Sequence, residues 1–166
     1  MKSRLMAPAS FIATLMLAVL SAVVPSSAAH AEAGGRWYFV NQYNHQCLKG
    51  NGEHKKLSLA PCKNKEAFHW INYGQFGFVN FSLDMYPFGG ICINEKGRGK
   101  TPTLEGCDTG DGVSGWRIND SHDGHKTLLV HIKCGYLQAV SKTKTVCTKR
   151  PANIKKMTWI VKYSLR

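Results

Sequence analysis

Residues 47–70 read CLKGNGEHKKLSLAPCKNKEAFHW, and the spacing of three of their side chains decides the fold. Cys47 and Cys62 stand 15 positions apart, and Trp70 follows 8 positions later. The same order returns twice along the chain, as Cys92, Cys107 and Trp116 and then as Cys134, Cys147 and Trp159. First cysteines recur after 45 and 42 positions and tryptophans after 46 and 43, so a unit of about 43 residues occurs three times.

Each unit contains short segments that favour β-strands. Aliphatic and aromatic residues gather in brief runs between glycine-rich turns. The tripeptide at 39–41, Phe-Val-Asn, returns at 78–80, and no window of 11 or more residues after the N-terminal apolar run shows helical periodicity. The predicted strands are 37–40, 57–59, 70–73, 91–93, 128–130 and 159–161.

Three all-β units of this size predict a closed β-trefoil with pseudo-threefold symmetry. A six-stranded barrel capped by three hairpins buries one shared core and leaves no long open edge. We expect each cysteine pair to close a hairpin within its own unit, which for a loop of about 15 residues is worth about 3 kcal/mol. The tryptophans are expected in the shared core, and the predicted disulfides are Cys47–Cys62, Cys92–Cys107 and Cys134–Cys147.

The pattern CLKG…LSLAPC…FHW at 47–70 resembles the repeat of ricin B-chain type β-trefoil lectins, and the resemblance covers 37–163. In that family a sugar-binding repeat carries an Asp two positions after its first cysteine. It also carries an aromatic residue two positions before the second cysteine and a Gln two positions before the tryptophan. The carboxylate accepts hydrogen bonds from vicinal hydroxyls, and the aromatic face covers the apolar side of the sugar ring.

Counted from the cysteines and tryptophans, every one of these family positions departs from the pattern. The Asp positions hold Lys49, Asn94 and Tyr136, the aromatic positions Ala60, Glu105 and Thr145, and the Gln positions Phe68, Ser114 and Met157. We therefore expect no galactose-type site of the family kind. A sugar site built differently stays open, with stacking faces from Tyr43, Tyr73, Tyr86, Phe88 and Tyr136.

The first thirty residues are typical of a secretory signal peptide. Lys2 and Arg4 precede an apolar run at 11–24, and Ala29-His30-Ala31 offers small residues for cleavage after Ala31. A membrane anchor is the alternative, but a span needs about 20 residues. The expected organisation is a signal peptide at 1–31, a flexible tail at 32–36 and a secreted β-trefoil at 37–166, with repeats at about 37–80, 81–122 and 123–166.

Positive charge is concentrated in the last repeat. The chain carries 22 Lys and Arg against 10 Asp and Glu, and residues 123–166 hold ten basic side chains and one acidic one. This lobe is either a solvated surface or a docking face for an anionic partner, such as another secreted protein or a cell-surface polymer or glycan. Nucleic acid ranks lowest, because no aromatics interleave with the lysines. The candidate docking residues are Lys142, Lys144, Lys149, Arg150, Lys155 and Lys156.

The N-terminal tail is a second candidate for partner binding. Gly34, Gly35 and Arg36 lead directly into the first predicted strand, which begins at Trp37. The tail is either a disordered terminus or a segment that orders in a partner's cleft, with Arg36 as its anchor and Trp37 fixing its exit.

Catalytic and metal-binding motifs are not recognised in this sequence. It has no Gly-x-Ser-x-Gly, no His-Glu-x-x-His and no phosphate loop, so we predict no enzyme and no cofactor. His122-Asp123-Gly124-His125 is interpreted as a turn with two exposed histidines, and no metal site is predicted. The carboxylates of the second unit, Glu95, Glu105, Asp108 and Asp111, are interpreted as solvated groups in turns.

Together these patterns predict a secreted, non-catalytic binding module. The leading hypothesis is a protein–protein adaptor, held to its partners by the basic third lobe, the acidic second lobe and the tail. In size, leader and N-terminal extension the chain is similar to the small trefoil adaptor subunits of umbrella-type secreted toxin particles. The alternative is a ricin-type lectin of altered specificity that binds cell-surface glycans, and a third class is a free-standing toxin or inhibitor.

Overall fold

The computed structural model describes residues 36–72, 77–80, 90–107, 115–149, 153–163 and 165. The predicted signal peptide, the tail up to Gly35, and Arg150 lie outside these residues. The strands are β1 (Tyr38–Asn41), β2 (Cys47–Lys49), β3 (Ser58–Ala60), β4 (Trp70–Asn72), β5 (Phe78–Asn80), β6 (Ile91–Asn94), β7 (Thr103–Gly106), β8 (Trp116–Arg117), β9 (Lys126–Leu128), β10 (Val130–His131), β11 (Gly135–Ala139), β12 (Thr145–Thr148) and β13 (Thr158–Lys162). Two short helices accompany them, η1 (Glu66–Phe68) and α1 (Ile154–Met157).

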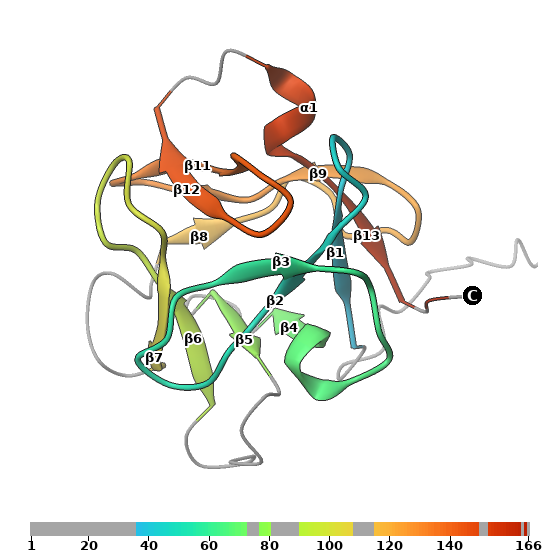
Figure 1. Ribbon diagram of the computed structural model, residues 1–166, viewed down its shortest axis with the longest axis horizontal. Coiled ribbons are helices and arrows are strands. Elements are labelled where there is room, and N and C mark those ends of the chain that lie inside the picture. Colours follow the sequence, from blue (N-terminus) through green and yellow to red (C-terminus); the bar gives the residue numbers. More distant parts are fainter. Residues whose placement is uncertain are drawn as a thin grey trace, which may run out of the picture. The chain divides into compact units, whose positions relative to one another are not determined.

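Three antiparallel sheets share one strand arrangement (Figure 1). In each sheet, the strand that begins at or contains the core tryptophan of one repeat pairs with the first strand of the next repeat. That first strand pairs in turn with a two-stranded hairpin. The three series are β13-β1-β2-β3, β4-β5-β6-β7 and β8-β10-β11-β12, and β9 extends the first beyond β13. This is the predicted β-trefoil. The pairings favour a boundary between the first and second repeats ahead of β5.

All six cysteines are bonded as predicted, but the third pair sits in a different register. The first strands of the repeats align through the pairs Val40↔Cys47, Val79↔Cys92 and Val130↔Tyr136. Tyr136 therefore takes the place of Cys47 and Cys92. In the third repeat, the family's sugar positions must therefore be counted from Tyr136 and not from Cys134. The position of the Asp is Gln138 rather than Tyr136, and the position of the aromatic residue is Thr148 rather than Thr145.

The shift carries the third disulfide into the shared core. Leu137 pairs with Cys147 where the first repeat pairs Leu48 with Leu59, so a sulfur fills a leucine position. Cys134 and Cys147 are both fully buried in the main core cluster. Sulfur is a good substitute there, because a buried cysteine packs as a small hydrophobe.

The shared core centres on the three tryptophans, as predicted. Trp70, Trp116 and Trp159 are almost completely buried in one cluster. The indole of Trp70 donates to the Leu48 carbonyl, and that of Trp159 donates to the Leu137 carbonyl, both over 3.1 Å. Each bond ties the last strand of a repeat to the hairpin of the same repeat.

Two features differ from the expected strands. The segment 128–130 is interrupted at Leu129, whose buried side chain points into the core between β9 and β10. Helix α1 was not anticipated, because a four-residue helix is too short to show a periodic stripe. Within the described part of the chain, no helix is long and apolar enough to cross a bilayer.

Candidate docking surface

The three hairpins of the trefoil meet through backbone hydrogen bonds. The Leu57 N–H donates to the Pro102 carbonyl over 2.9 Å and joins the first hairpin to the second. The Leu59 N–H donates to the Thr143 carbonyl over 3.0 Å and joins the first hairpin to the third. The second and third hairpins are joined by Cys147, whose N–H donates to the Lys100 carbonyl over 2.9 Å. The loops of all three repeats are thereby held close together.

A surface hollow lies where these hairpin loops meet, and each repeat contributes one lysine to it. We call it the lysine hollow; its lining is Lys56, Leu57, Gly99, Lys100, Thr101, Thr143 and Lys144. The three lysines are exposed, and none of the lining residues is acidic. Three cations around one hollow repel one another, so an anion that enters it gains from all three.

A second basic feature is formed around helix α1, and we call it the α1 ledge. It comprises Tyr43, Ile154, Lys155 and Lys156. Ile154 is 66% exposed and Tyr43 48% exposed, which is unusual for large hydrophobic side chains in this molecule. The Lys156 ammonium lies 5.0 Å from the centroid of the Tyr43 ring, a cation–π contact. The ledge therefore offers apolar area beside positive charge.

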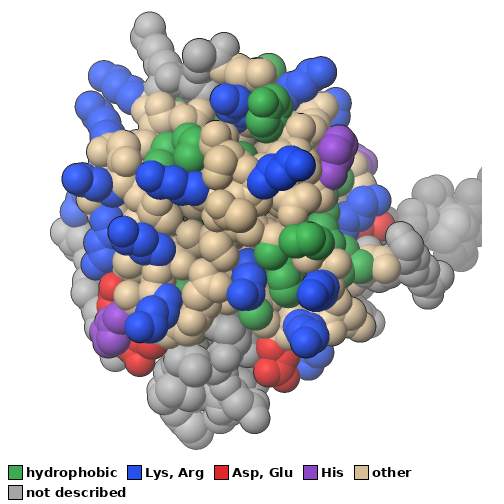
Figure 2. All heavy atoms as spheres, in the orientation of Figure 1, with side chains coloured by type: hydrophobic (Ala, Val, Ile, Leu, Met, Phe, Trp, Pro, Cys, Tyr) green, Lys and Arg blue, Asp and Glu red, His purple; other side chains and the backbone are tan. Residues whose placement is uncertain are grey.

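The loop between β1 and β2 connects the two features. Asn44 follows Tyr43 of the ledge, and its side-chain amide donates to the Ser141 carbonyl over 2.9 Å. Ser141 begins the turn that ends at Lys144, to which it is bonded through its hydroxyl. Figure 2 shows one face with lysine and arginine side chains spread over it, hydrophobic side chains between them and few acidic ones.

The structure places the predicted basic residues at different parts of the third repeat. Lys144 lies in the lysine hollow, Lys155 and Lys156 lie on the ledge, and Lys142 and Lys149 are exposed. The hollow also needs Lys56 and Lys100, which sequence reasoning missed. They belong to repeats with little or no positive excess. The shifted third register hides the equivalence of Lys56 to Lys144, and Lys100 stands one position before the equivalent place in the second repeat.

The described carboxylates of the second repeat are already engaged. Glu105 lies 3.2 Å from the Lys96 ammonium and 2.6 Å from His54 Nδ1. Burial opposes ionisation, but hydrogen bonds from Thr103, His54 and Lys96 outweigh it and lower the pKa of Glu105. Glu95 accepts the Gly97 N–H. The predicted use of this lobe as an acidic docking face thus depends on Asp84, Asp108 and Asp111, which lie outside the described residues.

The family's sugar positions are occupied by side chains that do not form its site. In the first repeat Lys49 and Ala60 replace the Asp and the aromatic residue, and Phe68 is buried in place of the Gln. In the third repeat Gln138 and Thr148 take the first two places, and Met157 is buried at the third. Among the stacking candidates, Tyr73, Tyr86 and Phe88 lie outside the described residues, as does Ser114 of the second repeat.

The base of the N-terminal tail is anchored in the barrel. Trp37 is buried, exchanges two backbone hydrogen bonds with Trp70 and packs at 6.4 Å and 18° against Tyr163. Its ring belongs to the core and is not accessible to a partner. Arg36 is exposed at the point where the tail leaves the barrel, so it is the tail residue in the described part that a partner can reach.

Comparison with known proteins supports the fold. No family model matches the chain, and no curated protein matches it. Among solved structures, the designed threefold-symmetric protein ThreeFoil matches with a TM-score of 0.58 at 13% identity, over 76% of this chain and 97% of that one. SeviL bound to the asialo-GM1 saccharide matches with a TM-score of 0.51 at 16% identity, over 76% and 95% of the two chains. At such identities the likeness shows the fold alone.

Proposed function

We propose that this chain is a secreted, non-catalytic adaptor that docks an acidic protein surface in its lysine hollow. The observation that carries the proposal is the meeting of one lysine from each repeat around a hollow without an acidic lining residue. An acidic loop of a partner would satisfy Lys56, Lys100 and Lys144 together. The hollow is formed by the hairpin backbones, which are fixed before a partner arrives, so docking requires little ordering.

The α1 ledge supports a second contact. Ile154 and Tyr43 supply apolar area, and Lys155 and Lys156 supply charge at its edge. Interfaces combine an apolar centre with a charged rim in this way. One small domain with a hollow and a ledge can join two partners, as an adaptor of a secreted toxin particle or a comparable extracellular assembly must. The tail, from 32 to Arg36, would add a third contact.

The test is charge reversal in the hollow. The triple variant Lys56→Glu, Lys100→Glu, Lys144→Glu should lose the proteins that co-purify in fixed ratio with the wild-type chain from culture medium. In direct binding to the identified partner, we expect the affinity to fall by at least about tenfold, because three attractions become repulsions.

A matched control distinguishes the effect of charges in the hollow from the effect of the net charge of the protein. The control triple changes the net charge equally at exposed lysines outside the hollow and the ledge, namely Lys63→Glu, Lys65→Glu and Lys133→Glu. It should keep most of the binding. If both triples bind as the wild type does, the basic residues serve only solubility and the adaptor proposal fails at this surface. Deleting residues 32–36 tests the tail in the same assay. Unchanged binding would reject the hypothesis that the tail inserts into a partner's cleft.

A lectin of altered specificity is the second candidate function. A groove beside the ledge is lined by the polar or cationic side chains of Gln42, Asn119 and Lys126 and by the apolar side chains of Leu128 and Ile154. Sugars fit such a combination, because ring C–H groups need an apolar face and hydroxyls need polar partners. SeviL shows that this fold can hold a saccharide. A glycan array decides: binding that Ile154→Asp abolishes supports the lectin, and a blank array supports the adaptor.

A further inference from the structure

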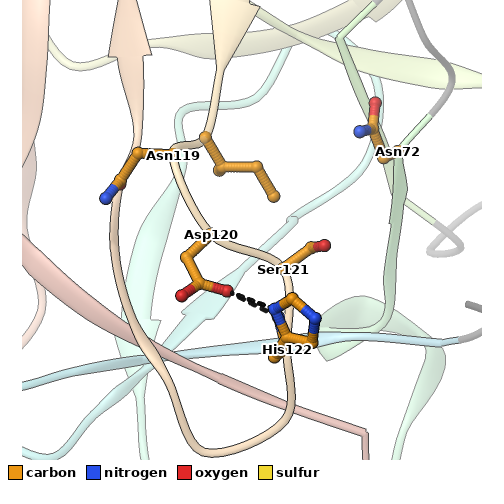
Figure 3. A pocket seen from close by; sticks show the side chains of 6 residues that line it. Asn72, Asn119, Asp120, Ser121 and His122 are labelled. Carbon is orange, nitrogen blue, oxygen red and sulfur yellow. Dashed lines mark hydrogen bonds and ion pairs between the residues drawn. The ribbon is translucent and has the colours of Figure 1, made fainter. Parts of the chain in front are cut away.

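Asp120, His122 and His125 form a cluster on the turn between β8 and β9. One ligand atom from each side chain lies within 4.8 Å of the other two. His122 Nδ1 lies 2.8 Å from Oδ1 of Asp120, and His125 Nδ1 lies 2.8 Å from Oδ2 (Figure 3 shows the first of these contacts). Two imidazoles thus converge on one carboxylate, in the spacing Asp-x-His-x-x-His. Sequence reasoning interpreted the two histidines as an exposed turn without a metal and did not include Asp120.

The turn that carries the cluster is fixed to β13. The Gly124 N–H donates to the Val161 carbonyl over 2.8 Å, and the Val161 N–H donates to the His125 carbonyl over 3.0 Å. Gly124 has a φ of 78°, which lets the chain reverse between the two histidines without strain. The Tyr163 hydroxyl donates to the Ser121 carbonyl over 2.7 Å. A site held in this way needs little rearrangement to accept an ion.

The three side chains provide charge and access. The His122 backbone N–H, followed by the His125 and His122 side chains, donates to the carboxylate and lowers the pKa of Asp120. The histidine side chains are 70% and 57% exposed, so ions in solution can reach both rings. Two imidazole nitrogens and one carboxylate oxygen form a donor set that zinc prefers.

We propose that Asp120, His122 and His125 bind one zinc ion at the surface of the barrel. Three protein ligands leave at least one coordination position open, as in zinc sites that exchange their fourth ligand. The cluster borders a pocket that Asn72 and Ser121 also line, so this position is accessible from solvent (Figure 3). The site is separate from the lysine hollow and does not depend on the adaptor function.

Isothermal titration of zinc chloride into the full oxidised chain, first freed of metal with a chelator, tests the proposal. We expect one zinc ion per chain, with the affinity reduced at least about tenfold by either His125→Gln or Asp120→Asn. His45→Asn is the matched control. His45 is exposed and outside the cluster, and asparagine tolerates its φ of 57°.

A second readout does not depend on any variant. In the nitrogen-15 spectrum of the wild-type histidines, zinc should shift the Nδ1 resonances of His122 and His125 and leave those of His45 unchanged. Thermal unfolding shows that the variants are folded. The proposal is overturned if zinc does not bind, if binding survives both substitutions, if His45→Asn weakens it equally, or if other imidazoles shift instead.

Discussion

At the scale of single residues, a buried asparagine side chain fixes the loop before two of the core tryptophans, Trp159 and Trp70. The Asn41 amide donates to the carbonyls of Lys156 and Thr158 over 2.9 and 3.4 Å. The Asn80 amide donates to the carbonyls of Ala67 and His69 over 3.2 and 3.1 Å. His131 is buried at the equivalent place in the third repeat. The Phe-Val-Asn tripeptide repeats in the sequence because its asparagine has this task.

Replacing Asn41 tests this role. We expect Asn41→Ala to lower the free energy of unfolding by about 1–3 kcal/mol, since the Lys156 carbonyl loses its side-chain donor and the Thr158 carbonyl keeps only the Gln42 N–H. Denaturant titration of the oxidised protein measures the change. The control is Asn51→Ala, at an exposed residue whose bonds are open to solvent, which should cost less than about 0.5 kcal/mol. Equal effects would contradict the role of Asn41.

His69 makes stability depend on pH. It is buried, and its Nε2 lies 2.7 Å from the Tyr38 hydroxyl. Burial and the charge of Arg36 lower the pKa of His69, although Glu66 opposes them. The unfolded state therefore takes up the proton more readily, so this contribution to stability is present above the unfolded pKa of about 6.5 and is lost as pH falls.

The expected result is a difference in slope between two proteins. The free energy of unfolding of the wild type should decrease from pH 7.5 to pH 5 more than that of His69→Gln, which does not titrate there. Parallel curves over this range would show that His69 has the same pKa in both states.

At the scale of elements, the third hairpin differs from the other two in where its disulfide lies. In the first repeat Cys47 is buried and Cys62 half-buried, outside the main core cluster. In the third repeat both sulfurs lie inside that cluster. Gly135, with a φ of 91°, has no room for a side chain because a Cβ would lie 2.3 Å from the Thr148 carbonyl oxygen. This glycine lets Cys134 bend back toward the core.

Removing one disulfide at a time should show that a disulfide inside the core contributes more to stability than one outside it. Cys47→Ala with Cys62→Ala should cost about 3 kcal/mol through the entropy of its loop. Cys134→Ala with Cys147→Ala should cost about 1–2 kcal/mol more, because it also leaves space in the core. Thermal unfolding under identical conditions gives the comparison. A larger loss at the first pair would mean that core packing around the third is looser than described.

The sequence predicted the elements better than their register. Repeated cysteines and tryptophans were sufficient for the fold, the disulfides and the core, because each is a strong local signal. The cysteines gave the wrong register in the third repeat. There Tyr136 occupies the position that Cys47 and Cys92 hold in the other repeats, and this is visible only in the strand pairing. The lysine hollow could not be predicted either, since Lys56, Lys100 and Lys144 come together through hydrogen bonds between hairpins.

At the scale of the whole molecule, the net charge and its distribution have separate effects. The formal charge of +12 raises encounter rates with any anionic surface. The hollow and the ledge each place several cations where they can contact one partner. Field effects between exposed charges fade beyond about 10 Å at 0.1 M salt, whereas contacts within a filled hollow are screened less.

Salt should therefore distinguish the two effects. Raising sodium chloride from 50 to 500 mM should weaken partner binding of the wild type, mainly through slower association. The variant Lys56→Glu, Lys100→Glu, Lys144→Glu should show a flatter or inverted dependence, because salt then screens repulsion in the hollow instead of attraction. Surface plasmon resonance measures both rates, and binding that is independent of salt would argue against an electrostatic dock.

The pairing of β1 with β13 brings the first and last strands of the barrel together. Tyr38 and Lys162 are direct partners in the antiparallel ladder, and Trp37 stacks on Tyr163 beside them. A short linker could therefore join the ends, and new ends could be opened at an exposed turn such as 51–52. Such a circular permutant would retain the barrel while moving any fused label or domain to the hairpin between β2 and β3, away from the paired β1 and β13.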